Sequence, residues 1–364
     1  MKRIWLVLGL LLALALAYLF FWPVPIEPVA WQAPPAPKLE GEYAVNDYLA
    51  KAERIGEGEG IGPEDVDVDA QGRIYGAYLD GRILRFDAQG KLLDTFADTG
   101  GRPLGLDFAP NGMLLVADAK KGLLALRPDG GLRVLSTEAN GLPYKFTDDV
   151  DAGPDGMIYF SDASSKFGFG EHMADILEHG GRGRLLKYDP LADLTTVLLD
   201  GLNFANGVAV SDRSDFVLVN ETGSYRVIRY WLKGPKAGEH EVFIDNLPGI
   251  PDGISTGNNG IFWLALYSPR VADLDRMSDK PWMRKLALRL PESLQPKPAR
   301  HAFVLGLNED GKVIHNLQDA GAGAYAPITS VEQEGEWLYL GSLTQSSIGR
   351  IKAPSPPDQV RGRH

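Results

Sequence analysis

The chain has no cysteine, and this absence removes whole classes of site. Without a thiol there is no disulfide framework, no zinc–thiolate centre and no cysteine nucleophile. Basic residues are also outnumbered, with 37 Lys and Arg against 48 Asp and Glu, which gives a formal net charge of −11. Nucleic acids attract proteins with clustered Lys and Arg, so we exclude nucleic acid as a partner.

A long apolar run without charge lies at the amino terminus. It comprises Ile4–Trp22 and follows Lys2 and Arg3. This length is about that of a helix that spans a bilayer, and the basic pair predicts a cytoplasmic amino terminus with the remainder exported. A cleaved signal peptide is the alternative, because Ala15–Ala17 fits a small-x-small cleavage site. We prefer an uncleaved, single-pass anchor, since the apolar run continues beyond that site.

The remainder divides into three parts behind the predicted signal-anchor, residues 1–22. Residues 23–50 are rich in proline and are interpreted as a stiff, extended linker. Residues 51–353 are the folded region, and residues 354–364 are a C-terminal tail. The 42 glycines of the chain favour many short turns over long helices.

The folded region repeats one pattern, a short strand, a tight turn and further short strands. The copies start at Pro63, Pro103, Thr147, Ala205, Pro251 and Ile328. Four short strands repeated every ~40–50 residues are typical of a β-propeller blade. We therefore predict an all-β fold, a six-bladed β-propeller. The sixth copy lacks a fourth strand because proline begins at Pro354, so we expect residues 52–56 to close the last blade.

The fifth copy contains an insertion that predicts a short amphipathic helix in blade 5. Its expected apolar face consists of Trp282, Met283, Leu286, Ala287 and Leu290, with Arg284, Lys285 and Arg289 elsewhere. Such a helix would cap the mouth of the propeller or touch an anionic membrane surface. Simple packing across the propeller rim is the alternative.

The residues that open the inner strands are expected to converge at one mouth of the central channel. They are Glu64, Leu104, Asp148, Asn206, Asp252 and Thr329. Three of the six are carboxylates and one is an amide, and carboxylates so close together repel unless one is protonated or a cation is bound. Oxygen ligands without His or Cys favour Ca²⁺ or Mg²⁺, and a roomy ring favours Ca²⁺. Taken singly, each is better explained as a turn or capping residue, and it is the recurrence at the same repeat position that favours the metal.

Four of these strand openings occur in longer motifs. GPEDV at Gly62, FTDDVD at Phe146, FANGVAV at Phe204 and IPDGIS at Ile250 resemble the calcium-binding six-bladed propellers. That group includes gluconolactonase/regucalcin, diisopropylfluorophosphatase, paraoxonase and strictosidine-synthase-like proteins. YFSDASSKF, GRLLKYDP and ITSVEQEGEWLYLGSL are most similar to the last branch, and within it to members like the adipocyte plasma membrane-associated protein.

The resemblance implies a catalytic calcium held by Glu64, Asp148, Asn206 and Asp252. Asp148 departs from the family, which usually has Asn there, so three carboxylates exceed the charge of Ca²⁺ by one. The resemblance also implies a catalytic role for Asp252, as a ligand and as the group that attacks or activates water. Glu64 belongs to the same catalytic set as a ligand of that ion.

A second, structural calcium is the other implication of the resemblance, with Asp65 and Asp149 as its ligands. Hydrogen-bonded turn carboxylates are the alternative for both. Thr329 stands where strictosidine synthase has its catalytic glutamate, so that condensation reaction is not expected. Gly253–Gly257 matches the G-x-S-x-G pattern of α/β-hydrolases, but we treat this as chance because the segment is predicted to be an inner strand. His301 is expected at the surface, with the channel mouth as the alternative.

These observations favour a calcium-dependent hydrolase of a lactone or aryl ester. Calcium would polarise the substrate carbonyl from the central channel. Leu104 and the insertion imply a partly apolar mouth, and hence a small lipophilic substrate. A non-catalytic, membrane-anchored propeller that serves as a binding scaffold is the alternative, because a fold does not decide function.

Overall fold

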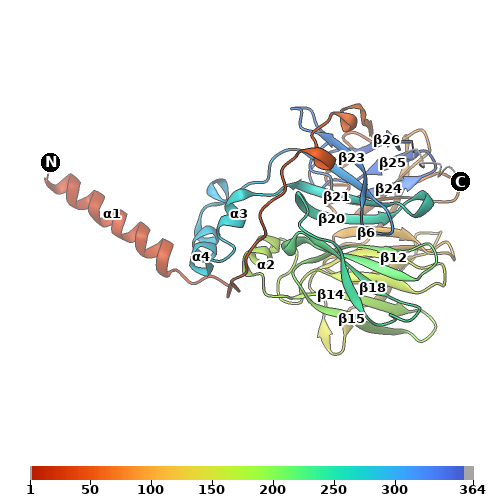
Figure 1. The fold of residues 1–364 in the computed structure, drawn as a ribbon, viewed down its shortest axis with the longest axis horizontal. Helices are drawn as coiled ribbons and strands as arrows, with labels where there is room; N and C mark the ends of the chain where they lie inside the picture. Colours follow the sequence, from red (N-terminus) through yellow and green to blue (C-terminus); the bar gives the residue numbers. More distant parts are fainter. Residues whose placement is uncertain (1, 356–364) are drawn as a thin grey trace, which may run out of the picture.

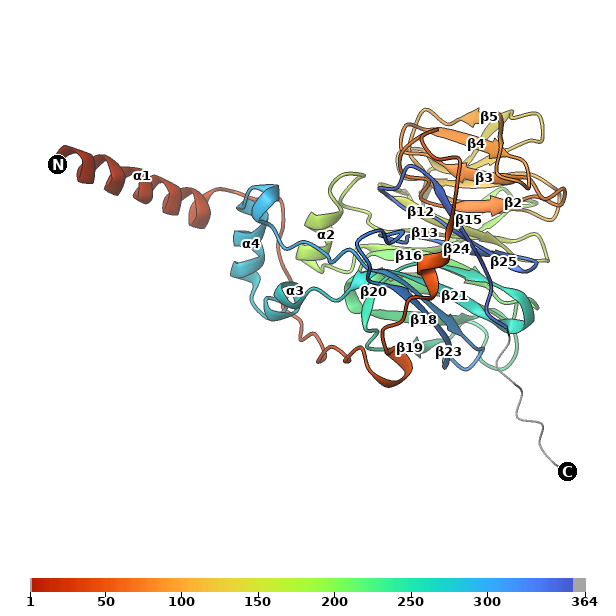
Figure 2. The same ribbon diagram turned by 90° about the horizontal axis from the view of Figure 1, so that it is seen from above.

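The computed structural model describes residues 2–355, and within them six four-stranded antiparallel sheets are arranged as the blades of a propeller (Figure 1). In the first five blades the strands follow one another in chain order. The view turned by 90° shows the same blades from above (Figure 2). The predicted six-bladed β-propeller is confirmed.

The strands of the first five blades have the following bounds. Blade 1 contains β2 (Val66–Val68), β3 (Ile74–Ala77), β4 (Arg82–Phe86) and β5 (Leu92–Asp98). Blade 2 contains β6 (Pro103–Phe108), β7 (Leu114–Asp118), β8 (Gly122–Leu126) and β9 (Leu132–Ser136). Blade 3 contains β12 (Thr147–Ala152), β13 (Ile158–Asp162), β14 (Gly183–Asp189) and β15 (Leu194–Leu202). Blade 4 contains β16 (Ala205–Val210), β17 (Phe216–Glu221), β18 (Arg226–Trp231) and β19 (His240–Ile244). Blade 5 contains β20 (Gly249–Thr256), β21 (Phe262–Pro269), β22 (Ala302–Leu307) and β23 (Val313–Asp319).

Blade 6 joins the two ends of the folded region. It contains β24 (Val331–Glu334), β25 (Trp337–Leu340), β26 (Ile348–Lys352) and, as its outer strand, β1 (Glu53–Ile55). Glu53 pairs with Arg350 and Ile55 with Ile348, so the predicted closing strand is confirmed. Each inner strand contacts the next, and β24 contacts β2. The ring is therefore closed, which removes the free edge of the sixth sheet.

The remaining elements lie outside the four-stranded sheets. All of them are short except the amino-terminal helix. The helices are α1 (Lys2–Phe21), α2 (His172–Glu178), α3 (Ala272–Arg276) and α4 (Pro281–Arg289). The 3₁₀ turns are η1 (Gly41–Tyr43), η2 (Tyr48–Lys51), η3 (Thr222–Ser224), η4 (Asn258–Gly260) and η5 (Glu292–Leu294). A small hairpin is formed by β10 (Glu138–Ala139) and β11 (Leu142–Pro143).

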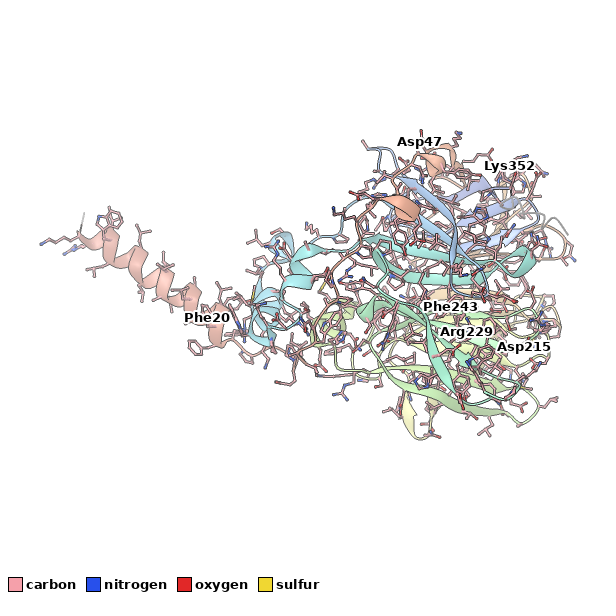
Figure 3. The ribbon with its side chains drawn as sticks, in the orientation of Figure 1. Phe20, Asp47, Asp215, Arg229, Phe243 and Lys352 are labelled. Atoms are coloured by element: carbon pink, nitrogen blue, oxygen red, sulfur yellow. The ribbon has the colours of Figure 1, made fainter. Side chains whose placement is uncertain are left out.

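The hydrophobic core is divided among the interfaces between neighbouring blades. Strand β17 shows why, because its side chains alternate between two faces. Phe216 and Leu218 pack toward blade 5, whereas Val217 and Val219 pack toward blade 3. On the outer strands, Arg229 lies 4.7 Å from the centre of the Phe243 ring (Figure 3). Every blade therefore depends on both neighbours for its stability.

Helix α1 extends away from the propeller, on the side where α2, α3 and α4 lie (Figure 1). It is the one helix in residues 2–355 that is long and apolar enough to cross a membrane. Phe20 lies at its propeller-proximal end (Figure 3). There Arg289 of α4 donates hydrogen bonds to the carbonyls of Leu19 and Trp22 at 3.0 and 2.6 Å. These bonds tie the end of the apolar helix to α4.

Helices α2, α3 and α4 form a cap over one face of the propeller. Helix α2 lies between β13 and β14, whereas α3 and α4 lie between β21 and β22. The expected apolar face of α4 is partly wrong, because Trp282 is 59% exposed while Arg284 is only 3% exposed. Arg284 is buried because its guanidinium donates to the carbonyls of Met277 and Val29 at 3.0 and 2.9 Å. The expected tail lies largely outside the described residues, which end at 355.

Candidate functional site

Five of the six residues that open the inner strands line one cavity beneath the cap. They are Glu64, Leu104, Asp148, Asn206 and Asp252. The sixth, Thr329, lines a narrower channel below them. All six side chains are buried. We call Glu64, Asp148, Asn206 and Asp252 the floor of the cavity, because they open the inner strands of the propeller beneath the cap.

Glycines beside the floor residues let the inner strands approach each other closely. A Cβ atom on Gly207 would lie 2.6 Å from the carbonyl oxygen of Asp252, so a side chain there would push β16 away from β20. Because the strands are close, Asn206 Nδ2 donates a hydrogen bond of 2.6 Å to Asp252 Oδ1. Gly253 likewise donates its N–H to the carbonyl of Thr329 at 2.7 Å. The local sequence Asn-Gly and Asp-Gly thus brings the polar side chains together.

Polar residues of neighbouring blades hold the backbone under the floor. Asn220 donates to the carbonyl of Asp252, and Thr222 Oγ1 donates to the carbonyl of Pro251 at 2.7 Å. Thr329 Oγ1 donates to the carbonyl of Glu64 at 2.7 Å. Sequence analysis did not identify Asn220 and Thr222. The sequence feature that could have identified them is the polar run of residues 220–222, which follows the apolar residues of β17.

Burial and mutual repulsion raise the pKa values of the floor carboxylates. Burial raises the pKa of Glu64 well above its ordinary value, and Asp252 raises it further. Burial also raises the pKa of Asp148, with Glu64 and Asp252 as the next causes. The pKa of Asp252 rises to about 7 through burial, while the hydrogen bond from Asn206 acts against this rise. Three carboxylates in one buried site therefore favour either bound protons or a bound cation.

The donor set of the floor fits a hard cation such as Ca²⁺. All four side chains offer oxygen atoms. Among the described residues, none donates a hydrogen bond to the side-chain oxygens of Glu64 and Asp148, although Glu64 is 7% and Asp148 5% exposed. Within residues 2–355, however, no group of three or more acidic or His side chains is drawn together at metal-binding distances. The donor atoms are therefore of the type that Ca²⁺ prefers, but the acidic side chains are not drawn together at metal-binding distances.

Arg102 is a buried cation that sequence analysis did not identify. It is 0% exposed, and its Nη1 donates to the carbonyl of Gly62 at 3.1 Å. Burial lowers its pKa, while Glu64 is the largest of the charges that raise it. Together with the three floor carboxylates, this guanidinium leaves two negative charges. With Arg102 included, the summed negative charge of the site therefore equals, and no longer exceeds, the positive charge of a divalent cation.

Asp65 and Asp149 use their carboxylates to join neighbouring blades. Asp65 accepts a hydrogen bond of 2.7 Å from Leu106 N–H in blade 2. Asp149 accepts one of 2.7 Å from Val208 N–H in blade 4 and one of 2.8 Å from Val150 N–H. Two adjacent aspartates thus do different things, since Asp148 faces the cavity and Asp149 holds the next blade. These bonds support the hydrogen-bonded alternative, and the second calcium stays a prediction.

We expect Asp149→Ala to destabilise the protein to the same extent with and without calcium. The substitution leaves Val208 N–H without its acceptor, and a buried unsatisfied donor costs about 1–3 kcal/mol. Thermal unfolding should show a lower Tm, with Asp200→Ala as the control because Asp200 is exposed. If the loss of Tm disappears when calcium is chelated, Asp149 is a calcium ligand rather than a bridge between blades.

The structure also places the residues that we expected to be uninvolved. Gly253–Thr256 lies within strand β20, so the G-x-S-x-G match has no strand-turn-helix context. His301 is not at the surface, which corrects that expectation, because it is 7% exposed and bonds Gln318 Oε1 at 2.9 Å. His301 is also absent from the cavity lining. Thr329 carries no carboxylate and binds a backbone carbonyl instead.

The cavity above the floor has a volume of about 340 Å³. Its walls are mostly apolar and come from the inner strands and the cap, for example Leu104, Phe146, Phe169, Met173, Ile176 and Phe204. The channel below has a volume of about 90 Å³, and seven of its eighteen lining residues are carboxylates. The cavity, called the chamber below, is therefore mostly apolar and has an acidic floor.

Comparison with known proteins identifies the family. A family model described as strictosidine synthase matches residues 148–235, and one described as the N-terminal part of strictosidine synthase-like proteins matches residues 41–86. Strictosidine synthase-like protein 10 of Arabidopsis thaliana is 37% identical over 341 residues, which cover 86% of this chain and 90% of that protein. The chain belongs to the strictosidine synthase-like family.

Other relatives of this strictosidine synthase-like chain agree with the resemblance seen in its motifs. The human adipocyte plasma membrane-associated protein is 32% identical over 353 residues, 90% of this chain and 84% of that protein. A gluconolactonase from Xanthomonas campestris has a TM-score of 0.61 at 16% identity, covering 91% of this chain and 99% of that one. The calcium-binding protein regucalcin from Agrobacterium tumefaciens has a TM-score of 0.56 at 15% identity, covering 84% and 94%. At such identities these two structures show the fold alone.

Proposed function

We propose that this strictosidine synthase-like protein is a calcium-dependent hydrolase of a lactone or aryl ester. The observation that carries the proposal is the floor, where three buried carboxylates, two of them without a hydrogen-bond donor among the described residues, face an apolar chamber. Gluconolactonase and regucalcin, whose fold is similar, are named for lactone chemistry and for calcium binding. Strictosidine-type condensation is not proposed, because Thr329 replaces the glutamate that it requires.

Glu64, Asp148, Asn206 and Asp252 would hold the ion in this proposal. When bound, calcium supplies a positive charge that polarises an ester carbonyl and stabilises the developing oxyanion. Without the ion, burial raises the pKa of Asp252 to about 7. With calcium bound, this carboxylate would stay ionised, so that it could accept a proton from water at neutral pH. The bond from Asn206 orients its carboxylate, and Asn220 fixes its backbone. Glu64 and Asp148 would hold the ion through their negative charges and would take no part in proton transfer.

The chamber supports a lipophilic substrate. Its apolar walls exclude water from the reacting carbonyl, and because most of the lining surface is apolar, the rest of the ligand would meet mainly apolar groups. The cap that covers the chamber is tied to α1 through Arg289. If α1 spans a bilayer, the chamber lies close to the surface from which a membrane-soluble ester would arrive.

The experiment is turnover of phenyl acetate and a panel of lactones by the full-length protein in detergent. We expect activity that a calcium chelator removes and added calcium restores. Stoichiometric calcium in the purified protein, measured by elemental analysis, is the second readout. Magnesium added after chelation provides the matched control, because it is smaller and prefers fewer ligands.

A non-catalytic binding scaffold is the second candidate. It is favoured because, within residues 2–355, no group of three or more acidic or His side chains lies at metal-binding distances. A protein that binds apolar ligands in the chamber but neither retains calcium nor turns over any ester would fit the scaffold and contradict the hydrolase.

We also propose that the propeller lies on the exported side of the membrane, because Lys2 and Arg3 precede the apolar helix. A reporter enzyme that is active only after export, fused after His364, is expected to be active. A signal from a reporter that works only in the cytoplasm would reverse the orientation.

A further inference from the structure

The proline-rich segment behind α1 is not a free spacer. Residues 23–35, here called the strap, form neither helix nor strand and run across the cap. Val29 N–H donates to the carbonyl of Glu178 at 2.8 Å, and Trp31 N–H donates to the carbonyl of Ser278 at 3.1 Å. The side chain of Ile26 is completely buried against the cap. The strap therefore bonds to both α2 and the segment between α3 and α4.

Two buried arginines fix the strap from the side of the cap. Arg284 donates to the carbonyl of Val29 at 2.9 Å, and Arg270 donates to the carbonyl of Pro34 at 2.7 Å. Burial lowers the pKa of Arg284 to about 10, so this guanidinium stays charged at neutral pH. Hydrogen bonds from a charged donor are stronger than neutral ones, and losing the acceptors would leave both guanidinia buried without these partners.

Trp31 is the strap residue that reaches the chamber. Its ring stacks on His179 with the ring centres 4.3 Å apart and an angle of 5° between the planes, and lies 6.0 Å from Tyr225. Burial lowers the pKa of His179 to about 3, so this stack is uncharged at neutral pH. Trp31 lines the same cavity as the floor residues. One aromatic wall of the chamber is thus supplied by the segment between the anchor and the propeller.

We propose that Trp31 determines which substrates fit the chamber. This inference rests on the proposed function for its substrate class, the lipophilic esters, and on the cavity alone for its geometry. The Trp31 ring limits the space inside the chamber, so it limits the size of the apolar group of an ester that can bind there. A smaller side chain at this position admits longer or wider groups. One extra methylene in an apolar pocket changes discrimination by about tenfold or more.

The first test measures access to the chamber without any catalysis. Because the chain has no cysteine, Ile176→Cys places a single thiol in the cavity wall, on α2. The full-length protein in detergent is labelled with a small methanethiosulfonate and with a bulky fluorescein maleimide. In the Trp31→Ala background, the bulky reagent should react about tenfold faster, the scale of discrimination by one methylene, and the small reagent at an unchanged rate.

Two variants control this test. Trp282→Ala removes an exposed tryptophan of the same cap that does not line the cavity, and should leave both labelling rates unchanged. Trp31→Phe keeps an aromatic ring and should give an intermediate rate, which separates pocket size from unfolding of the strap. Equal labelling rates in all backgrounds overturn the proposal.

The second test uses p-nitrophenyl esters of increasing acyl length. Trp31→Ala should raise kcat/KM for the octanoate relative to the acetate by about tenfold, the scale of discrimination in an apolar pocket. A change in thiol labelling without turnover of any ester by any variant would contradict the proposed hydrolase and leave Trp31 as a wall of the chamber. Turnover with an unchanged chain-length profile would contradict the role of Trp31 and leave the hydrolase standing.

Discussion

Replacing Asp252 by asparagine is expected to abolish turnover of esters and lactones while the propeller stays folded. Asparagine has the same shape and can still accept the hydrogen bond from Asn206, and Asn220 holds the backbone carbonyl of residue 252 in either case. What is lost is the negative charge and the ability to take a proton from water. Removal of a general base costs about 10²–10⁴-fold in rate. We expect a loss of this size in kcat/KM for phenyl acetate.

The matched control for this variant is Asp200→Asn, which changes an exposed aspartate in the same way. Asp148→Asn is the informative companion, because it restores the residue that the family usually has. It removes one floor charge and should lower calcium affinity while turnover is kept or raised. Full activity of the Asp252 variant would locate the chemistry elsewhere and favour the binding scaffold.

The architecture was predictable because the sequence repeats one pattern of strands and turns six times. Each copy supplies the same order of short strands and turns, and strand alternation alone assigns side chains to the two faces of a blade. The closing role of β1 was predictable too, since the sixth copy is one strand short and a ring with an open edge is unfavourable. Convergence of the floor residues followed from the same geometry, because equivalent positions of a repeat meet at the propeller axis.

The rest depends on contacts between segments that no local pattern connects. Asn220 and Arg102 have hydrogen-bond partners that are distant in the sequence and belong to other blades. The periodicity of α4 placed Arg284 on the outer face, whereas carbonyls of the cap and of the strap draw it inward. Proline content predicted a stiff, extended linker, but it carries no information on what this segment packs against.

The last expected result concerns stability, which without calcium should fall as the pH rises from about 4 toward about 7. The pKa of Asp65 is raised to about 6, and those of Asp151 and Asp252 to about 7, in each case chiefly by burial. In the unfolded chain an aspartate titrates near ~3.9. The folded protein therefore binds more protons than the unfolded chain across this range, and its free energy of unfolding decreases with increasing pH. Below pH ~4 both states are protonated, so this contribution is fully present there.

Calcium should reverse this trend, since an ion replaces the protons that the floor carboxylates otherwise need. A ligand at 100 times its Kd stabilises the folded state by about 2.7 kcal/mol, and metal affinity increases with pH because protons compete for the same oxygens. The measurement is Tm from pH 5 to pH 8 in chelator and in excess calcium. The difference between the two curves should widen with pH and shrink in Glu64→Gln, which loses a floor charge. Asp151→Asn should flatten the chelator curve without narrowing the calcium effect, because Asp151 lies in the channel and accepts its hydrogen bond from Val210 N–H of the next blade. Two parallel curves would mean that the floor binds no calcium, and a chelator curve that rises with pH would mean that these carboxylates are charged in the folded protein.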